Sequence, residues 1–479
     1  MMYSNALLTD FYELTMAAGY FYQNKGLDTA TFELYFRNNP FKGGYSIAAG
    51  LETAVHTVMN CRFGSDDIKF LEEQKTPNGV PVFGKEFLDY LASYRFKGDI
   101  RGIPEGTIVF PDEPLVQASG NLIECQIIES VLLCHINFQT LIATKAARIW
   151  ESSDHGSIIE FGLRRSQGPD GALSACRAAY IGGADATSNI LAAAQLGIPA
   201  KGTHAHSWIQ SFDTELDAFR AYAQIFPDSC ILLVDTYDTL TSGVPNAITV
   251  ARELGKKGQQ LLGIRIDSGD LVFLSREARK MLDQASLSNV KIVASNDLDE
   301  AAIADIRSQG GCVDIWGVGT RLVTGAGKGG SALGGVYKLV EHNGKPKIKL
   351  SSDSDKTTNP GLKKIIRFYD TDDLMESDIL ADISEDLSRG DVNAIDPKNP
   401  SRREELHHPH REELLHPILQ AGSIIYTFPD LDQIRDHRKE QLRRLHKNYR
   451  RLNNPPEYKV RLTEKLWLQK DRMLNRSGF

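Results

Sequence analysis

The chain has 479 residues, enough for two or three domains of ordinary size with a large hydrophobic core. Its composition, 41% hydrophobic and 24% charged, is typical of a soluble globular protein, and its net charge of -7 argues against a dedicated nucleic-acid binder. No uncharged apolar stretch reaches the ~18 residues that a membrane span needs, and residues 1–21 lack a signal-peptide pattern. The six cysteines are scattered and form no C-x-x-C pair. We therefore predict a cytoplasmic protein with reduced thiols and no membrane partner.

Residues 1–139 form the first predicted domain, which mixes helices and strands. A helix is expected to begin at Thr9-Asp10, a strand to cover residues 30–36 and a second helix to lie near residues 51–59. Further along, short strands between glycines and prolines are expected over residues 98–116. This pattern predicts a mixed α and β domain.

Residues 140–345 form the second predicted domain, in which strands and helices alternate. Each predicted strand is an apolar run that ends in polar residues; the runs are 157–162, 196–200, 230–234, 261–266, 291–294 and 313–318. Such strands, separated by helical segments, predict right-handed βα units and a parallel barrel covered by helices. In such barrels, chemistry lies at the carboxyl ends of the strands.

Residues 346–479 form a charged C-terminal extension. A long helix is expected over residues 431–451, and another is expected to begin near Thr463. The segment His407–His410 lies in a charged, proline-containing stretch, and we predict a solvated loop there.

The segment GTHAHS, residues 202–207, places two histidines after the predicted strand 196–200. Alternation along an extended segment would point His204 and His206 to the same side. Three interpretations are open: a metal pair, a catalytic histidine, or two histidines that only satisfy hydrogen bonds. A zinc pair is disfavoured because no H-E-x-x-H motif, third histidine or cysteine cluster accompanies them.

Other predicted strand ends carry groups suited to anions. Arg164-Arg165 precede a predicted Gly-Pro-Asp-Gly turn, and a guanidinium binds carboxylate or phosphate through two hydrogen bonds. Residues 267–270, Asp-Ser-Gly-Asp, offer carboxylates for a hydrated Mg²⁺ and a small turn for an oxyanion. Residues 317–320, Gly-Val-Gly-Thr, form a similar turn. This set fits a substrate with several phosphates, such as a sugar diphosphate with Mg²⁺.

One glycine-rich segment needs a separate interpretation. Residues 325–330 match the spacing G-x-G-x-x-G, but no convincing helix follows them. The segment therefore fails the context test for a dinucleotide site, and we predict a flexible loop near phosphate.

Several segments together resemble nicotinate phosphoribosyltransferases, in the order that this family has. They are residues 8–16 (LTDFYELTM), 161–171 (FGLRRSQGPDG), 202–207 (GTHAHS), 235–237 (DTY), 265–270 (RIDSGD), 333–339 (LGGVYKL) and 356–361 (KTTNPG). The resemblance covers nearly the whole chain and is looser after about residue 385.

The resemblance implies an α/β fold: an irregular α/β-barrel phosphoribosyltransferase domain, an N-terminal α/β sandwich domain and the C-terminal extension. It implies that nicotinate and 5-phosphoribosyl 1-diphosphate give nicotinate mononucleotide and diphosphate, the first step of nicotinate salvage to NAD. It also implies coupled ATP hydrolysis through a phosphohistidine, a requirement for Mg²⁺, and a homodimer.

The resemblance also assigns roles to residues of this chain. It makes His206 the phosphoacceptor and leaves His204 at a variable position. It places nicotinate against Tyr12, Arg164, Thr203 and Arg265, and 5-phosphoribosyl 1-diphosphate against Asp267, Ser268, Gly269, Gly319 and Thr320. No metal ligand is assigned.

An alternative from another enzyme class is a barrel aldolase or isomerase that acts on a sugar phosphate. It would need a Schiff-base lysine or paired acid–base carboxylates near a strand end. Lys201 is the lysine nearest to such a position.

Overall fold

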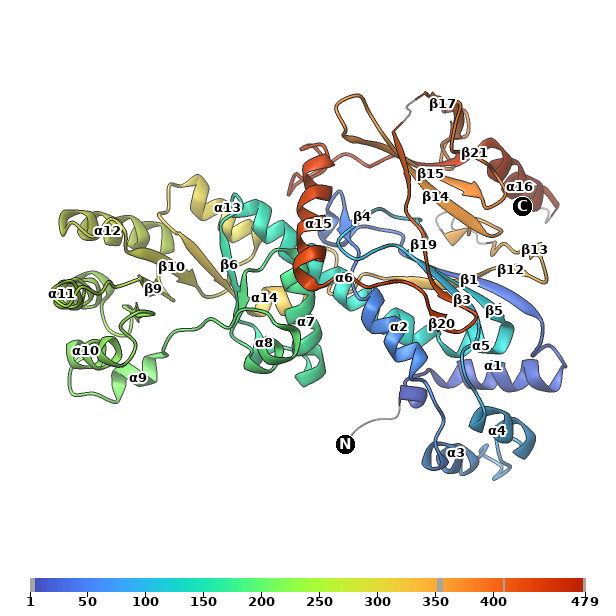
Figure 1. The fold of residues 1–479 in the computed structure, drawn as a ribbon, viewed down its shortest axis with the longest axis horizontal. Coiled ribbons are helices and arrows are strands. Elements are labelled where there is room, and N and C mark those ends of the chain that lie inside the picture. Colours follow the sequence, from blue (N-terminus) through green and yellow to red (C-terminus); the bar gives the residue numbers. More distant parts are fainter. Residues whose placement is uncertain (1–4, 351–355, 408–409, 477–479) are drawn as a thin grey trace. The chain divides into compact units, whose positions relative to one another are not determined.

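The computed structural model describes residues 5–350, 356–407 and 410–476, and the chain divides into two compact units (Figure 1). Residues 1–141 and 332–479 together make one, here called the two-segment unit. Residues 142–331 make the other, the barrel unit. The structure thus differs from the three-part division of the sequence, since the predicted extension, residues 346–479, groups with the N-terminal residues.

The first sheet of the two-segment unit joins strands from both chain segments. In the described residues its strands are β1 (Thr29–Tyr35), β3 (Asp99–Gly102), β5 (Val116–Asn121), β12 (Val336–His342), β13 (Lys345–Pro346), β19 (His416–Gln420) and β20 (Ser423–Ile424). Their order is β13-β12-β1-β5-β3-β19-β20, and all neighbours are antiparallel. β12 pairs with β1, and β19 pairs with β3. The second segment, residues 332–479, is called the tail below, and it completes a sheet that the N-terminal residues begin.

A second sheet comes from the tail alone. Within the described ranges its strands are β14 (Lys363–Tyr369), β15 (Met375–Asp382), β16 (Val392–Ile395), β17 (Arg403–Leu406), β18 (Arg411–Glu413) and β21 (Val460–Thr463), in the order β17-β16-β21-β15-β14-β18. Ile365 of β14 and Leu462 of β21 belong to the same hydrophobic core as Phe32 of β1. The two sheets therefore share one core, as an α/β sandwich requires.

Helices cover these sheets and end the chain. They are α1 (Phe11–Tyr22), α2 (Leu51–Met59), α3 (Ser65–Glu72), α4 (Lys85–Ala92), α5 (Leu122–Ile127), α15 (Leu431–Arg444) and α16 (Glu464–Arg476), with short 3-10 turns at Asn5–Leu7 and Pro40–Lys42 and a small ladder of β2 (Ser46–Ile47) and β4 (Ile108–Val109). The predicted helices at residues 51–59 and near Thr463 are confirmed. The helix predicted over residues 431–451 ends earlier, at Arg444.

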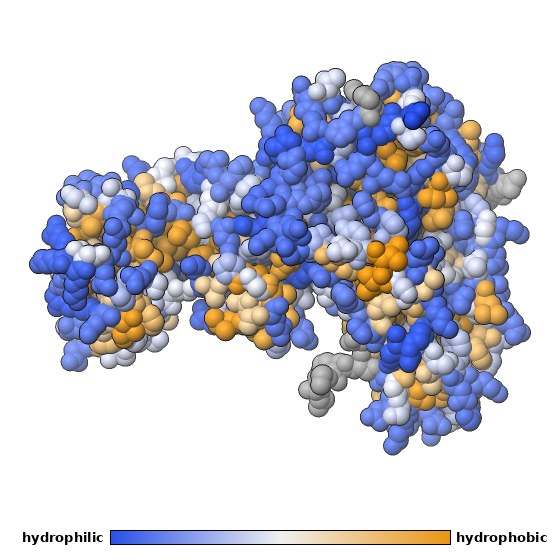
Figure 2. Space-filling view, viewed as in Figure 1, coloured by the Kyte–Doolittle hydropathy of each residue, from blue (hydrophilic) through white to orange (hydrophobic). Residues whose placement is uncertain are grey.

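Within the part of the chain that the structure describes, one helical stretch, Leu122–Ser152, is long and apolar enough to cross a membrane by length and composition alone. It comprises α5 and α6 (Glu129–Ser152), and 61% of its most apolar window is buried inside the protein. Figure 2 shows a mostly hydrophilic surface with scattered apolar patches on the face in view. Most of this stretch therefore packs inside the protein, as a core helix does.

Six parallel strands form the sheet of the barrel unit, all of whose residues are described. They are β6 (Ser157–Glu160), β7 (Ala186–Thr187), β8 (Ile231–Leu233), β9 (Gly263–Ile266), β10 (Lys291–Ser295) and β11 (Ile315–Val318). Their order is β7-β6-β11-β10-β9-β8, so the last strand, β11, pairs with the first, β6. The sheet therefore runs around the unit in chain order, as in a barrel, and the predicted α/β-barrel is confirmed.

Helices connect these strands (Figure 1). They are α7 (Gly168–Gly182), α8 (Ile190–Leu196), α9 (His206–Gln210), α10 (Glu215–Ile225), α11 (Val244–Gly255), α12 (Leu271–Gln284), α13 (Glu300–Ser308) and α14 (Thr320–Val323), with a 3-10 turn at Leu163–Arg165 and a π-helical turn at Thr239–Gly243. Apolar faces of α10 and α11 share a core with β8 and β9. Residues 325–330 are loop, as predicted.

Two local predictions in this unit were wrong. Gly168–Gly171 begins α7 instead of forming a separate turn, because proline fits the first turn of a helix. Residues 196–200 are not a strand: α8 begins after an Asn189 cap and ends at Leu196, where Gly197 caps it with a φ of 70°. Of that run, Ala200 alone makes a parallel bridge, to Thr187 of β7.

The barrel has one place without backbone pairing, which we call the seam. On one side lies the segment that follows Ala200, and on the other lies β8, which pairs with β9. No backbone ladder joins that segment to β8, although all residues of this unit are described. The barrel is therefore irregular, and the GTHAHS segment lies along its seam.

Candidate active site

Polar side chains gather at the carboxyl ends of β8, β9 and β10. Asp235 lies just beyond β8, Asp267 follows β9 directly, and Ser295 ends β10. These strands are neighbours in the sheet, so their ends meet at one edge. The site predicted from strand ends is therefore assembled here.

The carboxylate of Asp235 holds the turn after β9. Its Oδ2 accepts the backbone N–H of Asp267 at 2.8 Å and the hydroxyl of Ser268 at 2.6 Å. Its Oδ1 is buried and has no hydrogen-bond partner among the described residues. The hydroxyl of Ser295 donates to Oδ1 of Asp267. Two carboxylates thus lie on adjacent strand ends, a donor set that fits Mg²⁺.

Arg265 supplies a partly buried cation. Its Nη1 donates to the hydroxyl of Thr203 at 2.5 Å, and its guanidinium carbon lies 5.9 Å from the ring centroid of Phe161. Burial lowers the pKa of Arg265. The negative charges of Asp267 and Asp235 oppose this shift, and the positive charge of Arg164 adds to it. The Arg265 guanidinium, the Thr203 hydroxyl and the Phe161 ring thus lie close together, and the charge of Arg164 acts on Arg265. They suit a small aromatic carboxylate.

His206 begins α9 and is contacted through both ring nitrogens. Its Nδ1 lies 3.1 Å from the hydroxyl of Thr236, and its Nε2 lies 3.8 Å from Oδ2 of Asp267. The side chain is 39% exposed. His206 is therefore oriented by protein groups and remains accessible to a ligand.

His204 has a different environment. It is buried, and its Nε2 accepts the backbone N–H of Leu233 at 3.2 Å. Burial lowers the pKa of His204 to about 4, so the ring is neutral near pH 7. The two histidines therefore differ in environment: Nε2 of His204 is used by a backbone N–H, whereas His206 is accessible.

The predicted phosphate-contacting turns lie at the same edge of the sheet. Ser268 and Gly269 are exposed, and Gly269 has a φ of 77°. Gly319 and Thr320 follow β11, which pairs with β10, and Thr320 is exposed. Ser268, Gly269 and Thr320 are therefore exposed to a ligand, although the Ser268 hydroxyl already donates to Asp235.

Tyr12, the remaining predicted contact, belongs to the two-segment unit. It lies on α1 with its side chain 46% exposed. Its hydroxyl hydrogen bonds to Glu129, and burial together with this carboxylate raises the pKa of Tyr12. The predicted contact between Tyr12 and nicotinate stays a prediction.

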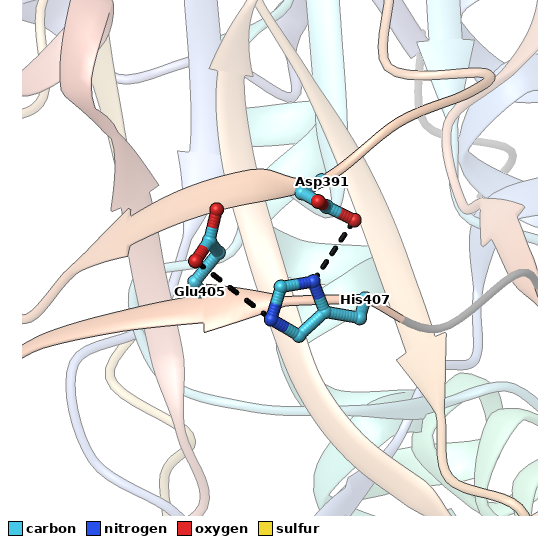
Figure 3. Close-up of side chains that lie close together, drawn as sticks. All are labelled: Asp391, Glu405 and His407. Carbon is cyan, nitrogen blue, oxygen red and sulfur yellow. Dashed lines mark ion pairs between the residues drawn. The ribbon is translucent and has the colours of Figure 1, made fainter.

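A second cluster of ligand-type side chains lies on the β16–β17 hairpin of the two-segment unit (Figure 3). Nδ1 of His407 lies 2.9 Å from Oδ1 of Asp391, and Nε2 lies 3.8 Å from Oε2 of Glu405. All three are exposed, and the hydrogen bond and charge of Asp391 raise the pKa of His407. Ion pairing explains this cluster. Of the predicted loop His407–His410, His408 and Pro409 lie outside the described residues.

At the strand ends of the barrel unit, several residues that contact the predicted site were not predicted from the sequence. Asp235, Thr236, Ser295 and Phe161 contact predicted site residues. The available signal was position, since Asp235 and Ser295 directly follow apolar strand runs. A serine at such a position is too common to be assigned from one sequence.

Comparisons with known proteins identify the family of this chain. Three family models match: the nicotinate phosphoribosyltransferase N-terminal domain over residues 7–137, the nicotinate phosphoribosyltransferase family over 157–385, and the C-terminal domain over 362–470. A nicotinate phosphoribosyltransferase of Bacillus subtilis is 40% identical over 485 aligned residues, which cover 98% of this chain and 94% of the relative. The chain belongs to the nicotinate phosphoribosyltransferase family.

Other members of the nicotinate phosphoribosyltransferase family support the same assignment. The human relative is 35% identical, with 96% of this chain and 95% of the relative covered. A crystal structure of human nicotinic acid phosphoribosyltransferase matches with a TM-score of 0.86 and 32% identity, over 97% of this chain and 99% of that one. The fold class and the family resemblance are confirmed, and the aldolase or isomerase alternative is not favoured.

Proposed function

We propose that this protein transfers the phosphoribosyl group of 5-phosphoribosyl 1-diphosphate to nicotinate, giving nicotinate mononucleotide and diphosphate. The observation that carries this proposal is the environment of Arg265: Thr203 is hydrogen bonded to it, Phe161 lies beside it, and the positive charge of Arg164 acts on it. Nicotinate presents an aromatic ring and a carboxylate, and both match these groups. Nicotinamide carries no negative charge and would match the guanidinium groups less well. Membership in the family supports the same substrate.

The second substrate is held at the turns after β9 and β11. We expect Ser268, Gly269 and Thr320 to contact its phosphates, because these residues are exposed at the same sheet edge as Arg265. In the reaction, the bond from ribose C1 to diphosphate breaks and the pyridine nitrogen bonds to C1. The ring must be held in line for this attack, so orientation by Phe161 and Arg265 contributes directly to the rate.

Mg²⁺ fits the carboxylates of Asp235 and Asp267, since one Asp235 oxygen is buried without a protein partner in the described chain. When bound there, Mg²⁺ would neutralise negative charge on the diphosphate. Asp235 also positions Ser268 and the backbone of Asp267.

ATP is proposed as a co-substrate that phosphorylates His206. The γ-phosphoryl group would leave ADP as the P–O bond breaks, and it would bond to a ring nitrogen of His206. Thr236 and Asp267 orient the ring for this step. Later hydrolysis of the N–P bond would release phosphate and restore His206. The added negative charge could order the neighbouring loops.

A homodimer and a cytoplasmic location complete the proposal. Exposed apolar side chains on α1, namely Phe11, Tyr12, Met16 and Tyr22, offer a surface that a second copy could cover. The six free cysteines suit a reducing compartment. Light scattering of the purified protein tests the dimer, and a monomer at micromolar concentration would contradict it.

A product assay tests the function. The protein is incubated with 5-phosphoribosyl 1-diphosphate and either nicotinate or nicotinamide, with and without ATP, and nucleotides are separated by chromatography. We expect nicotinate mononucleotide and diphosphate in equal amounts, faster with ATP, and little product from nicotinamide. Absence of product from nicotinate would overturn the proposal.

His206→Asn tests the phosphoacceptor separately. The variant should lose acid-labile labelling from γ-labelled ATP, whereas His407→Asn, which changes an exposed histidine of the other unit, should keep it. Labelling that survives in His206→Asn would show that another residue accepts the phosphoryl group.

A further inference from the structure

The seam of the barrel leaves β8 with one unpaired backbone edge. Toward β9, the carbonyl of Cys230 accepts the N–H of Leu262, and the N–H of Val234 donates to the carbonyl of Arg265. Leu233 lies between these positions, so its N–H points away from β9 and toward the seam. Leu233 is fully buried. A buried N–H without a partner costs about 1–3 kcal/mol, so this group needs an acceptor.

The acceptor is a side chain. Nε2 of His204 receives the N–H of Leu233 at 3.2 Å, in the place where a neighbouring strand would offer a carbonyl. Only a neutral imidazole can accept here, and burial keeps His204 neutral near pH 7. The ring also packs edge-on against Tyr222 of α10, with 4.7 Å between ring centroids. His204 is therefore fixed from two sides.

The loop fixed in this way carries the proposed chemical groups. The hydroxyl of Thr203 donates to the carbonyl of His204 at 3.2 Å and accepts from Arg265. On the other side of His204, His206 contacts Thr236, which lies three residues beyond Leu233. Two side-chain links, His204 to Leu233 and His206 to Thr236, thus join the loop to the end of β8.

We infer that His204 is a positioning residue that closes the barrel seam with its imidazole and thereby holds Thr203 and His206 in register with β8. Its effect on chemistry rests on the proposed function of His206 and Arg265, whereas the link to Leu233 is independent of that function. His204 contacts neither substrate nor phosphoryl group in this role.

Hydrogen exchange measures the link without any substrate. In the unmodified protein, the amide of Leu233 should be protected. His204→Leu keeps an apolar volume but removes the acceptor, so exchange in peptides that contain Leu233 should accelerate by about 10-fold or more, whereas β10 peptides should not change. His204→Gln offers an amide oxygen at similar reach and should restore protection. His204→Asn is shorter and should not.

Kinetics measure the consequence. His204→Leu should lower the rate of His206 labelling from ATP by about 10- to 100-fold, the size expected for a small misplacement of a reacting group. His204→Gln should recover most of that rate. The matched control is His135→Leu, a half-buried histidine of the two-segment unit that bonds to Thr57. It should leave both Leu233 exchange and labelling unchanged.

The outcomes separate this inference from the proposed function. Unchanged Leu233 exchange in His204→Leu, or equal behaviour of the glutamine and asparagine variants, would overturn the positioning role. If His204→Leu does not fold, the comparison of His204→Gln with His204→Asn decides the same question. If the unmodified protein is never labelled by ATP, the phosphohistidine is wrong, and the exchange result still tests the seam.

Discussion

Arg164 lies in the short 3-10 turn Leu163–Arg165 that comes after β6, and its charge lowers the pKa of Arg265. We predict that Arg164→Ala raises the KM for nicotinate about 10-fold, because a hydrogen bond to a charged group contributes about 1.5–3 kcal/mol. The melting temperature should not change, since the Arg164 side chain is exposed. Steady-state kinetics with varied nicotinate measure this. Arg165→Ala is the matched control, and an equal effect in both variants would argue for a general charge effect.

Glu13 of α1 is a buried carboxyl whose pKa is raised to about 7, mainly by burial, although hydroxyls of Ser130 and Thr9 bond to it. The folded protein therefore holds this proton more tightly than the unfolded chain, whose value is near 4.5. Stability contributed by Glu13 is full below the unfolded value and is lost as pH rises toward 7.

Glu13→Gln should remove this dependence. The melting temperature of the variant, relative to that of the unmodified protein, should rise between about pH 5 and pH 8. The unmodified protein loses stability over this range because the buried Glu13 carboxyl ionises, whereas glutamine does not ionise. Glu86→Gln, at an exposed position of α4, controls for the loss of one carboxylate. A difference that stays constant with pH would contradict the prediction.

At the scale of elements, the sequence predicted the strands that are long apolar runs and missed those that are not. β6, β8, β9 and β11 lie within predicted runs, and β10 extends one residue beyond its run, because parallel strands buried on both faces are nearly continuously apolar. β7 has two residues and leaves no such pattern. Residues 196–200 were predicted to be a strand because Ile198 and its neighbours are apolar. In the structure, Ile198 is buried but lies in a loop after α8. The hydrogen bond from Leu233 to the His204 side chain across the seam follows no pattern that could be recognised in the sequence.

The junction between β8 and α11 depends on a glycine. A Cβ at Gly243 would lie 1.8 Å from the carbonyl oxygen of Val234, which is backbone and cannot move aside. Gly243→Ala should therefore cost about 3 kcal/mol or more, the upper range for overpacked sites. Gly255→Ala, at the end of the same helix with nothing within 4 Å, should change stability by less than about 1 kcal/mol. Thermal unfolding compares them, and equal melting temperatures would contradict the expected close contact.

At the scale of the molecule, the tail is part of the first unit's core. Leu419 of β19 and Leu462 of β21 are buried in the core that contains β1. We predict that a chain ending at residue 345 cannot fold its N-terminal residues, and that limited proteolysis would cleave readily within residues 5–141. Resistance to proteolysis there would show that the tail is dispensable.

A single substitution in the tail also tests whether the tail stabilises the core of the two-segment unit. Leu462→Ala should cost about 2–5 kcal/mol, as for other fully buried leucines. Leu468→Ala, whose side chain is 41% exposed, should cost far less. Similar losses in the two variants would mean that the tail contributes little to the core.

The pairing of β12 and β19 with N-terminal strands also sets an order of events during translation. When the ribosome has made residues 1–141, β1 and β3 can each pair with β5, but their other neighbours, β12 and β19, have not yet been made. The barrel unit, a continuous segment, can finish first. The N-terminal strands wait on the order of tens of seconds for β19 to be made, at the usual pace of synthesis of about 5–20 residues per second. During this time their open edges are a target for chaperones.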